Sequence, residues 1–524
     1  AAVVRTIDEQ SRLQQTIADI NTLAQGENPL TAYGKRDELL KLYPRLHDNP
    51  ELTEAISAVS GKLAEQVAPH EETIPAANEE RPSPVIAEVA LADVSGEEIA
   101  DLKGHIAPFV IDGVLHVLQA DTGQLLWRRF VGRATLSAVP ASANPGADIL
   151  VVDTEHDDLL RLRGSDGQLV WRLPVGKSFE MVADPDYVWL AIENGELWAV
   201  DAITGDCQRQ VHFPQPLAGT PCFTESGRII QVADHSNVYV LDADSLQCES
   251  VYYLGHGLGT VRYPPVAVAG IVVVPHQVGL RRSLLHILRE TEQSNLTMAQ
   301  TPAVMDGQFG GPLVADRLHI GMLDQTGKLT LRVVDPAKQD APLEKLAETS
   351  GGAEAIAIQA GARDGYLIVG ANRLAAYRLA SACGNLSPRW VNHNGDEFVA
   401  PLQLIGDYVL HARRSSGRAG VIIAATARDA AEAQDAGRPI WENVISPGAP
   451  KSAWQRSSDG ESLTVQSAVG NAYEFSSPAD KSQVFNTPTL RTQRPGDYQS
   501  ALAMGEGRAV LVAAGETPLA SDHQ

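Results

Sequence analysis

The sequence predicts a mainly β fold: an eight-bladed β-propeller of four-stranded antiparallel blades, preceded by a short α-helical N-terminal segment. Three observations predict it. From about residue 85 onward, short apolar runs alternate with Gly, Asp and Asn turns. One sequence pattern returns after 44 residues, a period typical of propeller blades. The chain of 524 residues contains 44 glycines and 31 prolines, as many short strands and turns require.

Residues 1–68 are predicted as the helical N-terminal segment. Leu13, Ile17 and Ile20 recur at helical spacing on a polar background. Asn49-Pro50-Glu51 predicts the start of a further helix, because Asn caps the first turn, Pro suits the first helical position and Glu favours the helix dipole. The segment is either a helical spacer or partner-binding hairpin, or a cap on the domain that follows.

Residues 69–84, PHEETIPAANEERPSP, show no regular periodicity and are rich in Pro and Glu. This composition predicts a linker. Residues 85–524 are then predicted as the propeller.

The repeats carry the prediction of blades. Residues 123–128 read GQLLWR and residues 167–172 read GQLVWR, and the Gly-x-x-x-Trp spacing returns at Gly437 and Trp441. Each blade has two apolar faces and needs a neighbour on both sides to bury them. The turn Gly supplies positive φ between the third and fourth strands, and the flat Trp is suited to wedge between blades.

These residues resemble the PQQ-type repeat, whose consensus is close to G-x-L-Y-A-L-D-A-x-T-G-x-x-x-W. Residues 196–205 match it well, and so do 116–127 and 160–171. The resemblance covers most of 85–524 and is strong over 85–260. The family includes quinoprotein dehydrogenases and outer-membrane assembly lipoproteins of the BamB type, so the resemblance implies the fold and leaves the activity open.

The blade count follows from the expected second strand of each repeat. These strands are expected to start near His105, Ile149, Tyr187, Ile229, Ile271, Leu318, Leu367, Tyr408 and Ser462. Because rings larger than eight blades are rare, we expect about eight, in a range of about seven to nine, with the surplus used in ring closure or as an insertion. A last apolar run, at 509–514, is expected to pair with strands near 85–91 and lock the ring.

The formal net charge is −23, from 65 acidic and 42 basic residues. Such a field repels phosphate backbones, so no nucleic acid is expected as a partner. No apolar run is long enough to span a bilayer. The opening residues Ala1-Ala2-Val3-Val4 are either the tail of a removed hydrophobic segment or a frayed helix start. A removed targeting segment would place the protein in the periplasm or cell envelope and associate it with a membrane.

No catalytic, cofactor-binding or metal-binding residue is predicted. By the family resemblance, a quinoprotein dehydrogenase needs Ca²⁺, a Trp platform, a catalytic Asp and often adjacent cysteines, and this chain has no adjacent cysteines. No Gly-x-Ser-x-Gly, His-Glu-x-x-His or P-loop motif occurs. Asp324-Gln325-Thr326-Gly327 and Asp166-Gly167 are interpreted as hairpin turns rather than calcium loops, and the scattered histidines as strand or loop residues.

The cysteines give a structural prediction. None has a CxxC spacing, so no zinc site is expected. Cys207 and Cys248 lie one repeat apart, each just after the turn into a fourth strand, and Cys222 is expected on an innermost strand. Equivalent outer-rim positions of adjacent blades lie beyond the roughly 7 Å Cα limit for a disulfide. We therefore predict no disulfide among these three.

Several connections into an innermost strand carry an aromatic residue beside polar or small residues. Innermost strands line the central channel of a propeller, so these connections converge on one face. The rings either form a partly apolar funnel for a ligand or turn sideways and pack between blades. The candidate ligand-binding residues are Phe179, Arg262, Tyr263, Gln308, Phe309, Glu397, Phe398 and Trp454.

A propeller without catalytic motifs, joined to a helical arm, favours a non-catalytic extracytoplasmic scaffold that binds a protein or peptide partner on one face. This step rests on analogy with other propellers. The alternatives are a quinone-dependent dehydrogenase that uses PQQ and Ca²⁺, and a glycan-binding propeller of the cell envelope.

Overall fold

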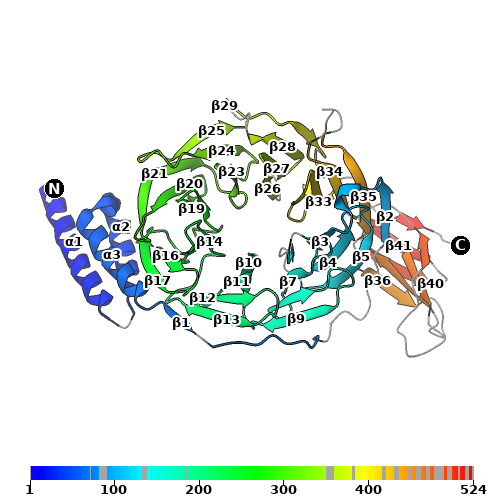
Figure 1. The fold of residues 1–524 in the computed structure, drawn as a ribbon, viewed down its shortest axis with the longest axis horizontal. Helices are drawn as coiled ribbons and strands as arrows, with labels where there is room; N and C mark the ends of the chain where they lie inside the picture. Colours follow the sequence, from blue (N-terminus) through cyan, green and yellow to red (C-terminus); the bar gives the residue numbers. More distant parts are fainter. Residues whose placement is uncertain are drawn as a thin grey trace.

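Eight antiparallel sheets follow one another around a ring in the computed structural model, which confirms the predicted fold class (Figure 1). The structure describes residues 2–26, 28–70, 72–81, 91–132, 138–142, 144–184, 186–349, 359–379, 384–415, 420–429, 436–446, 450–455, 462–467, 472–476, 489–492, 498–505, 508–513 and 519–521. The described strands run through the chain as the repeats predict.

The N-terminal segment forms α1 (Ala2–Ala24), α2 (Thr31–Leu42), the short 3₁₀ helix η1 (Pro44–Asp48) and α3 (Pro50–Ala64). The Asn49 side chain accepts a hydrogen bond from the backbone N–H of Leu52, as the capping prediction requires. None of the helices described in this segment is long and apolar enough to cross a membrane.

The helices pack against the outside of the ring at blade 4 (Figure 1). The buried Tyr33 hydroxyl lies 2.9 Å from Ser60 Oγ and donates to Asn237 Oδ1 at 3.0 Å, and its ring stacks on Tyr253. The contact joins α2 and α3 to two strands of one blade. This arrangement agrees with the expectation of a cap on the domain that follows.

The stretch after the helices runs along the outer rim of the ring. Strand β1 (Ala68–His70) pairs with the outermost strand of blade 3, and Ile74 and Ala77 form isolated bridges with Cys207 and Arg172. Arg81 then forms an ion pair with the buried Asp158, with Nε and Oδ2 2.7 Å apart.

The blades are numbered in chain order, and each runs from the innermost to the outermost strand. Blade 1 has β3 (Ile106–Ile111), β4 (Val114–Gln119) and β5 (Leu125–Phe130). Blade 2 has β6 (Val139–Pro140), β7 (Ile149–Asp153), β8 (Asp158–Leu162) and β9 (Leu169–Pro174). Blade 3 has β10 (Phe179–Ala183), β11 (Tyr187–Ile192), β12 (Glu196–Asp201) and β13 (Cys207–His212). Blade 4 has β14 (Cys222–Phe223), β15 (Arg228–Val232), β16 (Asn237–Asp242) and β17 (Cys248–Tyr253).

The second half of the ring follows the same order. Blade 5 has β18 (Val266–Val268), β19 (Ile271–Gly279), β20 (Arg282–Glu290) and β21 (Leu296–Asp306). Blade 6 has β22 (Val314–Asp316), β23 (His319–Leu323), β24 (Leu329–Val334) and β25 (Leu343–Glu348), with β29 (Gly384–Asn385) added in parallel. Blade 7 has β26 (Gln359–Arg363), β27 (Tyr366–Gly370), β28 (Leu374–Arg378) and β30 (Trp390–Asn392). Blade 8 has β31 (Glu397–Phe398) and β32 (Gln403–Ile405), both paired with β33 (Tyr408–Arg414), then β34 (Val421–Ala427) and β35 (Pro439–Ser446).

Ring closure differs from the prediction. Strand β2 (Leu91–Gly96) adds to β35 at the outer edge of blade 8. The apolar run at 509–514 is expected from the sequence to pair with strands near 85–91. Its residues 509–513 instead lie in β41 (Arg508–Ala513), which pairs with β40 (Tyr498–Gly505) and β42 (Leu519–Ser521). The ninth repeat start, Ser462, begins β37 (Ser462–Ser467) in a sheet with β36 (Pro450–Gln455), β38 (Ala472–Ser476) and β39 (Thr489–Thr492), which Figure 1 shows outside the ring.

The core is divided among the blade interfaces. Eight separate apolar clusters lie between the eight pairs of neighbouring blades, and a ninth lies within the helices. Each blade therefore depends on the two beside it, as the repeat pattern predicts.

The repeat tryptophans wedge between blades, as predicted. Trp171 of blade 2 lies over Gly205 of blade 3, where a Cβ atom would come within 2.4 Å of the ring. Gly205 has φ of +79°, so the position favours glycine for its backbone as well as for space. The same contact joins Trp441 of blade 8 to Gly123 of blade 1, and this contact closes the ring.

Candidate functional site

Blade 1 is three-stranded within the described residues. Its strand β3 occupies the register of β7 and β11, the second strands of the next two blades. No described strand fills in blade 1 the position that β6 and β10 fill in those blades. The inner edge of β3 faces the channel instead of an innermost strand.

The hydrogen bonds of β3 show which of its backbone groups face that edge. The Ala120 N–H donates to the His105 carbonyl at 2.9 Å, so by alternation Ala107, Phe109 and Ile111 pair with β4. Ile106, Pro108 and Val110 then direct their backbone groups to the inner edge. Pro108 has no N–H, and its carbonyl accepts a hydrogen bond from the Gln403 side chain of blade 8.

A pocket of about 680 Å³ lies at this edge. Residues of blade 1 (within 101–110), blade 2 (within 138–147) and blade 8 (401–408) line it, together with Arg363 of blade 7. Four blades thus contribute to one cavity. Its volume lies in the range of known ligand pockets.

The pocket has apolar walls and one polar end. Among its lining residues, Ile405 of blade 8 packs against the cluster between blades 8 and 1, and Ala138 of blade 2 packs against the cluster between blades 1 and 2. At the end near the start of β3, the Tyr408 hydroxyl donates to the exposed Asp101 at 3.4 Å. Such walls suit apolar side chains.

The other charges at the polar end have protein partners. Asp407 is bonded to Arg428 at 2.6 Å. Arg363 donates to the Leu404 carbonyl at 2.8 Å and lies 3.5 Å from Asp364. The arginine of the lining is therefore occupied by protein acceptors.

Comparison with known proteins supports the repeat assignment. Residues 111–244 match the model of the PQQ repeat family described as outer membrane protein assembly factor BamB. Residues 111–244 carry PQQ-type repeats. The match spans most of blades 1 to 4, the stretch in which the consensus residues are strongest.

The solved structures that match this chain share little sequence with it. The computationally designed Ika8 protein is 11% identical, with a TM-score of 0.34, and the match covers 64% of this chain and 93% of Ika8. BamB from Moraxella catarrhalis is 14% identical, with a TM-score of 0.29, and the match covers 72% and 96%. A search of curated proteins gave no match.

The pocket of this PQQ-repeat propeller does not fit a quinone cofactor. A polycarboxylate quinone needs unpaired cations, but Asp101 and Asp407 lie at the polar end and Arg363 already donates to a carbonyl. In the part of the chain that the structure describes, no three His, Cys, Asp or Glu side chains converge as a metal site requires. No step through such a group is derived.

None of the eight predicted ligand-binding residues lines the pocket. Phe179, Phe309 and Phe398 are buried in clusters between blades, and Tyr263 packs half-buried against the cluster of Phe309. These four rings therefore pack between blades, which is the second of the two arrangements expected from the sequence. The side chain of Trp454 lies outside the described residues.

The polar members of the predicted set are dispersed. Arg262 is exposed, with its Nε 3.5 Å from the Gly259 carbonyl, while the Gln308 side chain reaches the Gly279 carbonyl at 3.5 Å. Glu397 is half-buried, 4.0 Å from Arg414. Binding of a ligand by these residues stays a prediction.

Replacing Phe309 or Phe398 with alanine is expected to lower the free energy of unfolding by about 3 kcal/mol or more, because each ring is buried between two blades. Tyr263→Ala is expected to cost less, since Tyr263 is half-buried. Urea denaturation of the three variants measures the difference. Parental stability of Phe309→Ala would restore the funnel interpretation.

Sequence reasoning missed the pocket because a missing strand leaves no motif. One signal was present: Pro108 interrupts an apolar run that otherwise reads as a buried strand. Proline within a strand indicates an edge, since it cannot donate to a ladder. This signal also points to Ile106 and Val110, whose backbone groups lie at the same edge as those of Pro108.

The cysteines lie where the blade register places them. Cys207 and Cys248 begin β13 and β17, and each thiol contacts the carbonyl two residues later, at 3.6 and 3.5 Å. Cys222 begins the innermost strand β14, and all three are free. Cys383 lies outside the described residues.

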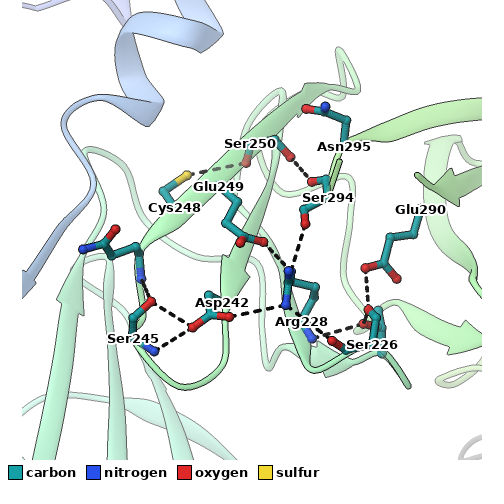
Figure 2. A network of polar contacts seen from close by, with 12 residues as sticks. Ser226, Arg228, Asp242, Ser245, Cys248, Glu249, Ser250, Glu290, Ser294 and Asn295 are labelled. Atoms are coloured by element: carbon teal, nitrogen blue, oxygen red, sulfur yellow. Dashed lines mark hydrogen bonds and ion pairs between the residues drawn. The ribbon is translucent and has the colours of Figure 1, made fainter. Parts of the chain in front are cut away.

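Figure 2 shows the surroundings of Cys248. Ser250 Oγ donates to the Ser294 carbonyl at 2.6 Å, and Arg228 of the same sheet donates to Ser294 Oγ at 3.1 Å and pairs with Asp242 and Glu249. These bonds tie blade 4 to the β20–β21 turn of blade 5.

The three thiols are expected to react slowly in the native protein and completely in denaturant without reductant. Burial raises the pKa of Cys207, Cys222 and Cys248 to about 12 each, so little thiolate forms at neutral pH. Titration with a thiol reagent, followed by mass spectrometry of the labelled peptides, checks both points. A pair protected in denaturant would show that the blade register is wrong.

Proposed function

We propose that the protein is a non-catalytic binding protein that acts outside the cytoplasm and holds a protein or peptide partner in the pocket at the inner edge of blade 1. The observation that carries the proposal is the open backbone edge of β3 inside a cavity built by four blades. Backbone groups, apolar walls and one acidic end suit recognition of a polypeptide better than chemistry on a small molecule.

The extracytoplasmic setting rests on the matched family, whose description names an outer membrane assembly factor. The net charge of −23 fits a polypeptide partner rather than a nucleic acid. A removed N-terminal segment would add attachment to a membrane.

Photo-cross-linking tests the proposal directly. Ser142 lines the pocket and is exposed, so a benzoylphenylalanine in its place should form a discrete adduct with one protein of a cell-envelope extract. Ile203, 77% exposed in the turn between β12 and β13, is the matched control on the outer rim. Adducts that are equal at the two positions, or absent at Ser142, contradict the proposal.

The PQQ family also contains dehydrogenases, so one enzymatic activity is tested beside binding. The full chain is incubated with the quinone and Ca²⁺, and alcohols and sugars are offered with an electron-accepting dye. We expect no turnover, because the lining acids disfavour the cofactor. Saturable turnover would replace the proposal by the enzymatic one.

A further inference from the structure

We propose that the partner enters the pocket as an extended peptide, which pairs with the inner edge of β3 and completes blade 1 as its innermost strand. This inference rests on the proposed function and specifies the form of the ligand. It is argued from the backbone groups, the length of the site and the side chains on its walls.

The backbone groups at the edge call for a strand. Ile106 and Val110 are 7% and 3% exposed, and within the described residues no partner is found for their backbone groups on the inner side. Buried backbone groups without hydrogen bonds are costly, and a paired strand satisfies a donor and an acceptor at each residue. A ligand without regularly spaced amides cannot do the same at both positions.

The length of the site matches a short strand. Ile106 and Val110 are four residues apart, which is about 13 Å along a strand. The innermost strands β10 and β26 of blades 3 and 7 have five residues each. A segment of about five residues therefore fills the position as these strands fill theirs.

Pro108 divides the edge into two bonding positions. Because it has no N–H and its carbonyl is bonded to Gln403, the peptide pairs with Ile106 and Val110 and passes over Pro108. Removing the Gln403 amide frees one more acceptor in the middle of the edge. Gln403→Ala is therefore expected to bind such a peptide at least as tightly as the parent.

The walls define the peptide side chains. Ile405 lies on the blade 8 side and Ala138 on the blade 2 side, so both faces of the peptide meet apolar residues. Innermost strands run antiparallel to the second strand of their blade, as β6 and β10 do, so the C-terminal end of the peptide lies near the start of β3 and the exposed Asp101. The preferred ligand is a short apolar stretch followed by Lys or Arg.

The test begins with a library of linear peptides displayed on phage and selected on the full chain. Selected peptides should contain an apolar stretch of about five residues followed by a basic residue, and Ser142→Trp, which fills the pocket, should not retain them. N-methylation of a selected peptide at alternate residues should weaken binding about tenfold, while methylation between them should have little effect. This alternation identifies strand pairing and is independent of protein stability.

Amide hydrogen exchange of the full chain locates the peptide. On addition of the selected peptide, the amides of Ile106 and Val110 should slow strongly, while those of Ala107 and Phe109, already bonded to β4, should change little. A peptide that binds without this change, or without the methylation pattern, overturns strand addition and leaves the proposed function standing. Strand addition is also overturned if no peptide is selected that binds the parent and fails to bind Ser142→Trp. The Ser142 cross-link tests the proposed function separately.

Discussion

Replacing Trp441 with alanine is expected to be among the most destabilising single changes in the ring, with a loss of about 4 kcal/mol in the free energy of unfolding. The Trp441 side chain is 1% exposed in the cluster between blades 8 and 1. Its Nε1 donates to the Ala120 carbonyl at 3.0 Å, and its ring covers Gly123. The substitution leaves a cavity and an unpaired buried carbonyl at the interface where the ring closes.

Trp127→Ala is the matched control. Trp127 makes the same contact between blades 1 and 2, over Gly167 and with a 2.8 Å bond to the Gly164 carbonyl, but it is only half-buried. Urea denaturation of both variants should show the smaller loss for Trp127→Ala. Equal losses would mean that closure depends on the pairing of β2 with β35 rather than on the Trp441 wedge.

The fold could be predicted because each repeat carries the residues that determine its own turns and its contact with the neighbouring blade. Trp127, from the copy at 123–128, lies over Gly167, from the copy at 167–172, so the two copies make one contact between neighbouring blades. The same contact recurs through the ring. Closure was predicted wrongly, because the partner of β2 lies about 350 residues away in the chain and any apolar run near the C-terminus satisfies the same pattern. The sequence pattern does not indicate which of several distant strands lies beside β2.

The pocket and the buried polar groups could not be predicted in the same way. The pocket lies where no described strand fills the innermost position of blade 1, and in the sequence Pro108 marks the edge at that position. His276 and His286 lie on paired strands with their ring nitrogens 3.0 Å apart, but they are ten residues apart in sequence. Spacing rules for single strands do not detect a pair made across a hairpin.

The buried histidines are expected to make the protein sensitive to mild acid. Burial lowers the pKa of His256 to about 3 and that of His276 and His286 to about 4. His256 Nε2 donates to the Ala233 carbonyl at 2.8 Å, and the His256 ring lies 6.1 Å from that of His276. These three rings form one cluster between blades 4 and 5.

Other blades carry the same feature. His116 and His393 have a pKa lowered to about 4 by burial, and burial lowers the pKa of the fully buried His411 well below its usual value. The His411 ring of blade 8 lies 5.1 Å from that of His393, which follows β30 of blade 7, and the two rings are tilted by 51°. The histidines whose pKa is lowered by burial are therefore distributed around the ring rather than confined to one interface.

The direction of the pH dependence follows from the lowered pKa values. The folded chain keeps these rings neutral, whereas the unfolded chain takes up protons below pH about 6.5. The free energy of unfolding is therefore unaffected by them above that pH and falls as the pH drops from about 6.5 to about 4. Each fully buried ring contributes a loss on the order of 1–2 kcal/mol at pH about 5, so the sum is several kcal/mol.

Urea denaturation between pH 8 and pH 4.5 measures this loss, and one substitution assigns part of it. His286→Gln removes a titrating group from the cluster and should flatten the pH dependence, even if it lowers stability at pH 8. His212→Gln, at an exposed position on β13, is the matched control and should leave the curve unchanged. If His286→Gln has the same slope as the parent, the cluster is hydrated in solution, and the acid sensitivity comes from buried histidines outside it, such as His116 and His411, which are 5% and 0% exposed.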